Sequence, residues 1–227
     1  MSSRSLVVVL IGVAVVSTPM SAQLCAGRPS FARHPYHAFS HTVFGHAGRT
    51  LAGGLTFGEG GVFGEIGLGT TRFDDWDASS LSFAGAAGSQ FSIGDDDLVH
   101  VCPGVSVDFG FGPNDLDVFG GGDRFGFRER DVAVGAALGV VVYRSRQVQI
   151  IPTASLNLVS ANARMKNQRT GAVTSVSDEF GLYGLGVGVL VKHAFALRPT
   201  ISVPFGIRGA TAVFAFTLSV GLGQRSR

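Results

Sequence analysis

Apolar residues alternate with small or polar residues along most of the chain after residue 35. The alternation is clearest in residues 98–111, and it recurs in residues 131–143, 148–158 and 182–191. One face of the first segment would carry Val99, Val101, Pro103, Val105, Val107, Phe109 and Phe111, and the other Leu98, His100, Cys102, Gly104, Ser106, Asp108 and Gly110. A period of two is typical of β-strands with two unlike faces.

The same pattern predicts about ten strands, separated by turn residues. They span residues 36–44, 49–57, 62–73, 79–93, 98–111, 129–143, 147–160, 179–192, 198–208 and 211–223. Eight strands is the alternative, because the first segment and the tight turn at 209–210 are the least distinct. The predicted fold is therefore all-β, a closed antiparallel barrel over residues 36–227.

The composition decides which face of the strands points outward. Charged residues make up 15% of the chain, against about a quarter in ordinary soluble proteins. The second face carries Gly, Ala and Ser, which fill a narrow barrel, where a solvated face would carry Lys and Glu. We therefore predict a transmembrane barrel with an apolar band facing lipid. The predicted lipid-facing residues include Val105, Val107, Val134, Leu138, Leu156 and Val187. A secreted, soluble, lipocalin-like barrel is the alternative.

Substitutions on the two faces of a strand should therefore destabilise the barrel to different extents. Val134→Arg, toward lipid, should destabilise the barrel, and Gly135→Ser, toward the lumen, should be much milder.

The N-terminus has the features of a secretory signal peptide over residues 1–22. Arg4 provides a positive start, residues 6–16 are apolar, and residues 17–22 are mostly small. A membrane anchor, or a lipoprotein acylated on Cys25, are the alternatives. Residues 23–35 show no periodicity and are interpreted as an irregular segment.

The lengths of the links predict the topology. Those at 58–61, 94–97, 144–146 and 193–197 are short, whereas 112–128 and 161–178, on the other side, are long. Outer-membrane barrels have short periplasmic turns and longer extracellular loops. We therefore expect loops 112–128 and 161–178 outside the cell and both chain ends in the periplasm.

Export places the two cysteines in an oxidising compartment. Only one intramolecular pair is possible, Cys25 with Cys102. Cys102 belongs to the inward-facing set of its strand, so the bond requires residues 23–35 to enter the barrel mouth as a partial plug. Two free thiols are the alternative.

The segments 63–77 (FGEIGLGTTRFDDWD), 98–115 (LVHVCPGVSVDFGFGPND) and 197–207 (LRPTISVPFGI) resemble small outer-membrane barrels of the OmpA/OmpX-like kind. The resemblance implies the cell outer membrane as the location, with lipid and the barrel-assembly machinery as partners. One departure is that the chain runs past its last apolar strand residue, Leu222, as residues 223–227, whereas the class commonly ends on an aromatic residue.

Candidate chemistry is sparse. The sequence contains no hydrolase or zinc motif, and we expect no metal and no cofactor. His46 with Asp74, Asp75 or Asp77 could form a hydrolytic site at the outer rim, but a polar loop with Trp76 at the membrane interface is the simpler interpretation. Asp95 to Asp97 is read as a solvated turn.

The loop 112–128 carries Phe119, Phe125 and Phe127, so it could bind a small apolar ligand or fold into the lumen. The net charge of +2 gives no basic stripe for nucleic acid. We therefore expect a protein that is not an enzyme, with a structural, surface-interaction or narrow-pore role. Because eight to ten strands leave little internal space, we expect side chains to close the lumen.

Overall fold

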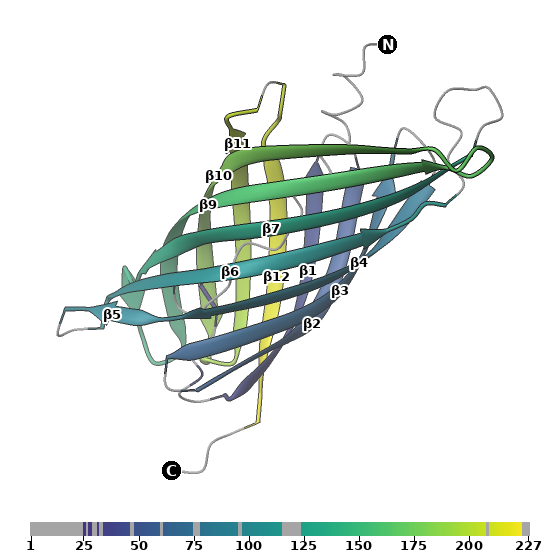
Figure 1. Ribbon diagram of the computed structural model, residues 1–227. Helices are drawn as coiled ribbons and strands as arrows, with labels where there is room; N and C mark the ends of the chain where they lie inside the picture. Colours follow the sequence, from purple (N-terminus) through teal and green to yellow (C-terminus); the bar gives the residue numbers. More distant parts are fainter. Residues whose placement is uncertain are drawn as a thin grey trace.

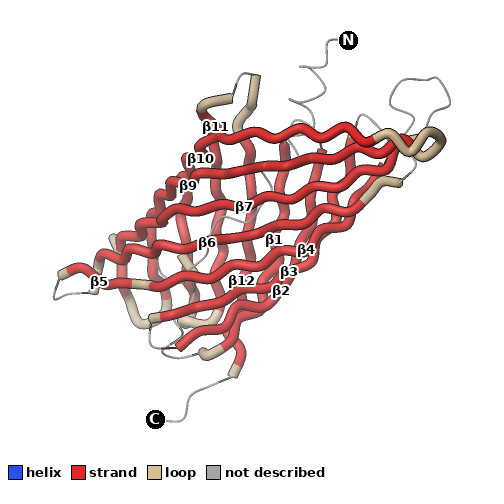
Figure 2. Tube along the Cα trace, viewed as in Figure 1, coloured by secondary structure: helices blue, strands red, loops and turns tan. Residues whose placement is uncertain are grey.

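All regular structure in the described part of the chain is β-strand, as Figure 2 shows. The computed structural model describes residues 25, 27, 28, 31, 34–45, 48–59, 61–74, 78–94, 97–114, 124–207 and 209–223. No helix in these residues is long and apolar enough to cross a membrane. The predicted signal peptide, residues 1–22, lies outside the described residues.

The strands form one closed antiparallel barrel (Figure 1). In chain order they are β1 (Tyr36–Gly45), β2 (Gly48–Glu59), β3 (Val62–Phe73), β4 (Ala78–Ser89), β5 (Phe91–Ile93), β6 (Val99–Phe111), β7 (Phe125–Val140), β8 (Tyr143–Arg144), β9 (Val148–Asn167), β10 (Val173–Val191), β11 (Phe195–Phe205) and β12 (Val213–Leu222). The short strands β5 and β8 continue β4 and β7 along the same neighbours. Since β12 pairs with β1, the result is a closed ten-stranded barrel.

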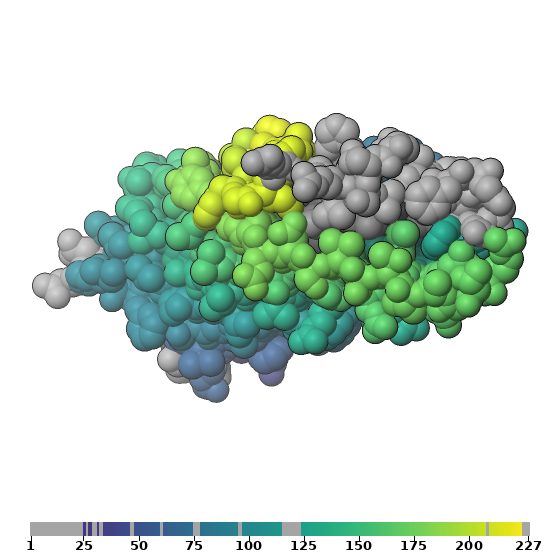
Figure 3. All heavy atoms as spheres, turned by 45° about the horizontal axis from the view of Figure 1, so that its top comes forward, coloured from purple at the N-terminus to yellow at the C-terminus, as the bar shows by residue number. Residues whose placement is uncertain are grey.

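The strand number predicted from the sequence is confirmed, but one predicted loop is wrong. Residues 161–178 are not a long loop, because β9 and β10 stay paired as far as Lys166 and Val173. Only residues 168–172 turn between them, and the hairpin projects at one end of the barrel in Figures 1 and 3. Likewise, β7 begins at Phe125 and not at residue 129, which shortens the predicted loop 112–128.

The barrel has two ends with different links. At one end, here called the turn end, the connections are residues 60–61, 94–98, 145–147 and 192–194. At the other, the loop end, they are residues 46–47, 74–77, 112–124, 168–172 and 206–212. The turn end corresponds to the predicted periplasmic side, and it also holds the start of β1 and the end of β12. Which end faces the periplasm stays a prediction.

The two faces of the wall are as the alternation predicts. Large apolar side chains that point outward are exposed, among them Val105, Val134, Leu138, Leu156 and Val187. Val107 lies on the same outer face and is half-buried. A band of exposed Val, Leu, Ile and Phe around a closed barrel is what a lipid-facing surface requires.

The expectation for Gly135→Ser needs correction. A Cβ at Gly135 would lie 2.1 Å from the carbonyl oxygen of Leu156 and 2.7 Å from the Cα of Asn157. Backbone atoms of a paired strand cannot move aside without disturbing the ladder. This inward position therefore requires glycine, and a serine there is costly although it points away from lipid.

Candidate functional site: a filled lumen

The N-terminal segment lies inside the barrel near the turn end. Its described residues are Cys25, Gly27, Arg28, Phe31, His34 and Pro35, and all except the half-buried Pro35 are buried. They contact inward-facing positions on several strands, described below. The segment thus crosses the lumen from wall to wall, as the sequence argument for a partial plug requires.

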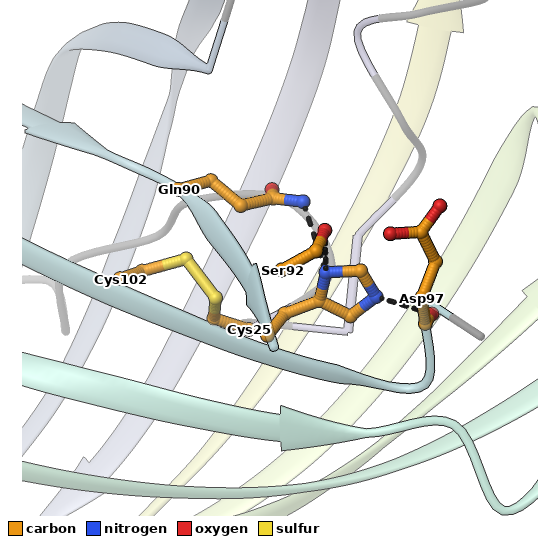
Figure 4. Close-up of a disulfide and its surroundings, with 6 residues drawn as sticks. Cys25, Gln90, Ser92, Asp97 and Cys102 are labelled. Atoms are coloured by element: carbon orange, nitrogen blue, oxygen red, sulfur yellow. Dashed lines mark hydrogen bonds between the residues drawn. A yellow bond between two sulfur atoms is a disulfide. The ribbon is translucent and has the colours of Figure 1, made fainter. Parts of the chain in front are cut away.

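A disulfide fixes one end of this segment. Cys25 is bonded to Cys102 of β6, with the two Cα atoms 6.0 Å apart and a sequence separation of 77. Figure 4 shows the bond beside the β5–β6 turn. The predicted pair is therefore present, and Cys102 does face the lumen with His100.

A buried ion pair fixes the middle of the segment. The Arg28 guanidinium donates to Glu65 Oε2 of β3 at 2.8 Å and to Thr56 Oγ1 of β2 at 3.0 Å. It also lies 4.8 Å from the centre of the Phe39 ring of β1, in a cation–π contact. All these groups are buried, and a buried ion pair is stable only in a well-defined geometry. The Arg28–Glu65 pair therefore restricts the movement of the N-terminal segment.

Close backbone contact adds a third attachment. Gly27 has φ +63 and lies so near Gly188 of β10 that a Cβ on Gly188 would be 2.3 Å from the Gly27 Cα. A side chain at either position would push the segment away from the wall. Glycine on both sides is thus a requirement for the segment to fit.

Ring contacts fix the last turn before β1. Phe31 stacks on His37 of β1, with ring centres 4.7 Å apart and planes 3° from parallel. His34 Nδ1 donates to the carbonyl oxygen of Gly223 at 2.7 Å, which ties the segment to the end of β12. The lumen at the turn end is therefore occupied from β6 across to β12.

The loop-end half of the lumen is filled differently, by apolar side chains. An inward-facing cluster brings together residues from β1, β7, β9, β10 and β12, with Ile207 packed against it. Its members are Val43, Ala133, Val159, Ala161, Phe180, Leu182, Val213 and Ala215. A smaller cluster at the turn end contains Val141, Ile151, Leu190 and Ala196. It explains why Ile151 interrupts the polar face of its strand.

Polar and acidic side chains line the remaining inner wall. Asp108 of β6 lies directly opposite Asp131 of β7, and Glu129 follows two positions along the same inward face. His41 of β1 and Thr217 of β12 are hydrogen-bonded at 2.8 Å. Among the described residues, no group of three or more His, Cys, Asp or Glu side chains is arranged to hold a metal ion.

His100 has a structural role at the β5–β6 turn. Its Nε2 donates to the carbonyl oxygen of Asp97 at 2.9 Å, so its Nδ1 is the acceptor facing Ser92 Oγ at 3.2 Å and Gln90 Nε2 at 3.3 Å (Figure 4). These contacts hold Asp97 against the wall, whereas Asp95 and Asp96 of the predicted turn lie outside the described residues.

The residues considered for rim chemistry are mostly outside the described part of the chain. The described residues do not include His46, Asp75, Trp76, Asp77 or most of the loop that carries Phe119. Asp74 is described and exposed at the end of β3. The residues that the sequence reasoning missed are Arg28 and Glu65. The available signal was that Glu65 is the single acidic residue of β3, on the inward face of a strand rich in apolar residues and glycine.

Comparison with known proteins gives similarity in structure alone. The chain matches no family model and no curated protein. It is similar to the KdgM porin, at 6% identity and a TM-score of 0.40, over 82% of this chain and 99% of that one. It is also similar to the N-terminal barrel of Pseudomonas aeruginosa OprF, at 10% identity, a TM-score of 0.36, and 84% and 99% coverage. Escherichia coli outer membrane protease OmpT gives 8% identity, a TM-score of 0.44, and 84% and 94% coverage.

The outward face of the barrel carries the apolar band. A closed antiparallel barrel with such a band is the architecture of outer-membrane proteins, and the cell outer membrane is the location that this architecture supports.

Proposed function

We propose that this chain is an outer-membrane barrel with a closed, non-conducting lumen, and that it has a structural or surface-interaction role. The observation that carries the proposal is the filling of both halves of the lumen. The N-terminal segment occupies the turn end, and the apolar cluster around Phe180 and Leu182 occupies the loop end. Ions would need both to move before they could pass.

The partners in this proposal are the lipid around the apolar band and the machinery that assembles outer-membrane barrels. The last strand supports the second partner, since Phe214, Phe216 and Leu218 are exposed in phase on its outer face. The absence of enzymatic activity is also part of the proposal. A rim hydrolase built on His46 is the competing function, and it predicts lipid or peptide hydrolysis that His46→Ala abolishes.

Conductance in planar bilayers tests the proposal. The purified, oxidised protein should insert without giving discrete current steps. Insertion is checked separately by flotation with vesicles and by the faster migration of the unboiled protein on a gel. Regular steps from the inserted wild-type barrel would contradict a closed lumen and favour the narrow-pore role.

A matched pair of variants tests the two seals. Cys25→Ser with Arg28→Ala should free the N-terminal segment but remain silent, because the apolar cluster still closes the loop end. Adding Phe180→Ala and Leu182→Ala should produce current steps. If the first variant already conducts, the loop-end cluster does not seal the barrel.

A further inference from the structure

Four basic side chains gather on the outer face of the barrel at the loop end. They are Arg128 and Arg130 of β7 and Arg164 and Lys166 of β9, and all four are exposed. Phe127 and Asp131 are buried toward the lumen, so Arg128 and Arg130, at the alternate positions of β7, point outward. We call these four residues the basic cluster.

The basic cluster has no partner within the described part of the chain. Arg128 lies directly opposite Arg164, and Arg130 and Lys166 are their diagonal neighbours across the same pair of strands. None of the four forms an ion pair with a described residue. Like charges placed directly opposite each other destabilise a sheet. An arrangement of this kind is relieved when an anion binds between the side chains.

Along the barrel wall, the basic cluster lies at the height of a membrane–water interface. Arg128 is paired with Phe111, and Arg130 with Phe109, on the outer face of β6. Aromatic side chains form girdles where the hydrocarbon meets the headgroups. The basic cluster is thus at the depth where lipid phosphates lie.

An apolar groove of about 810 Å³ crosses the outer wall next to the cluster. Its floor is low because β3 and β4 carry Gly64, Gly85 and Ala87 at outward positions that elsewhere hold large side chains. A Cβ at Gly85 would meet nothing closer than 3.9 Å, so the space above it is open. The walls are formed by Phe57, Ile66, Val105, Val107 and Val132.

The groove and the cluster are continuous. Val132 lines the groove and lies two positions along β7 from Arg130, on the same outer face. Consecutive outward residues of a strand are separated by about 7 Å, and an arginine side chain spans that distance. From Val132 the groove passes through Val107 to Gly85 across paired strands.

The geometry points to a lipid-binding site, in which the basic cluster holds a doubly phosphorylated headgroup and the groove takes one of its acyl chains. Four cations on two strands provide more charge than one phosphate requires, and arginine binds phosphate oxygens in a bidentate manner. With the loop end outside the cell, the ligand is a lipid of the outer leaflet with the chemistry of lipid A. The inference rests on the membrane placement in the proposed function, and not on the closed lumen.

Competition binding in detergent micelles tests this site. Labelled bis-phosphorylated lipid A is displaced by the unlabelled lipid, by its mono-phosphorylated form or by phosphatidylglycerol. Wild-type protein should prefer the bis-phosphorylated lipid, and Arg128→Gln with Arg164→Gln should weaken its binding about tenfold or more, as the loss of charge-assisted hydrogen bonds implies. Arg144→Gln with Arg146→Gln removes the same charge at the turn end and should leave binding unchanged.

A second variant tests the groove without changing charge. The leucine side chain of Gly85→Leu has room on the outer wall, so the variant should fold. It should weaken binding of acylated lipid A but not of the chain-free bis-phosphorylated disaccharide. Equal binding by wild type and the double glutamine variant, or equal displacement by phosphatidylglycerol, would overturn the site. Unaltered acyl-lipid binding by Gly85→Leu would overturn the role of the groove.

Folding of each variant is checked by its migration when unboiled. If the wild-type chain fails to integrate into membranes, the proposed function fails. An integrated barrel without preference for lipid A contradicts this inference alone.

Discussion

Arg28 is the residue on which the position of the N-terminal segment most depends. Its charge lies in the barrel interior, where, among the described residues, Glu65, Thr56 and the face of Phe39 replace water. Replacing a buried ion pair by apolar groups is often harmless, but removing one partner leaves an unpaired charge. The consequences of changing Arg28 and of changing both partners should therefore differ.

Arg28→Ala should lower the free energy of unfolding by about 3–5 kcal/mol, because Glu65 is left buried without its cation. Urea titration of the protein in vesicles, followed by circular dichroism, measures the loss. The double variant Arg28→Ala with Glu65→Ala should recover part of it. Arg146→Ala, at the exposed 145–147 turn, is the control. Equal stabilities of Arg28→Ala and this control would show that the ion pair contributes nothing.

The close contact between Gly188 and Gly27 gives a second prediction about a single residue. Gly188→Ala should lower the free energy of unfolding by about 1–3 kcal/mol, since its Cβ overlaps the Gly27 backbone. It should also make the N-terminal segment cleavable by protease in the folded protein. Gly85→Ala, whose Cβ has open space, should change neither property. Full protection of the segment in Gly188→Ala would contradict the close contact.

At the scale of elements, hydrophobic periodicity predicted the strands wherever one face meets lipid. It failed in residues 161–178, because Arg164 and Lys166 point outward there and the apolar face disappears. The hydrogen-bonded ladder continues regardless, since backbone pairing does not require apolar side chains. Boundaries beyond the apolar band were therefore not predictable from the pattern.

Val134 tests the lipid-facing assignment of β7. Val134→Arg should lower the free energy of unfolding by about 2–4 kcal/mol near the bilayer midplane. Val134→Leu is the matched change at the same position, and it should have little effect. Unfolding in vesicles of matched thickness gives both values. A Val134→Arg barrel as stable as Val134→Leu would mean that this face contacts water.

The β9–β10 hairpin gives a topological prediction. Trypsin added to intact cells should cut after Arg169, which is in the exposed turn, and not after Arg164 or Lys166, which are in paired strands. Mass spectrometry of the fragments identifies the site. Cleavage only after the cells are opened would place the loop end in the periplasm and reverse the topology.

For the whole molecule, the sequence predicted a closed barrel with small inward residues, and it predicted the Cys25–Cys102 pair. It did not predict the loop-end cluster, because Val43, Phe180 and Val213 come together only when the barrel closes. Long-range packing of this kind leaves no local pattern in the chain. The residues of the N-terminal segment were missed for a related reason, since Arg28 acquires a partner only through the tertiary fold.

The disulfide makes a prediction about global stability. Cys102→Ser should lower the free energy of unfolding by up to about 4–5 kcal/mol, the chain-entropy value for a loop of this length. Cys25→Ser and the double serine variant should match it, because each removes the same link. Reversible unfolding under non-reducing conditions measures all three. Stabilities equal to that of the oxidised wild type would show that the link constrains nothing.

The position of the two cysteines also constrains the order of assembly. Both belong to the first half of the chain, whereas the strands that complete the wall, β10 to β12, are synthesised and exported last. The bond can therefore form in the periplasm while the sheet is still open on one side. The tethered N-terminal segment would then be enclosed when β12 pairs with β1, and it would not have to enter a barrel that is already closed. In this order of events the covalent link would guide the segment into the barrel during biogenesis, before it contributes anything to the mature barrel.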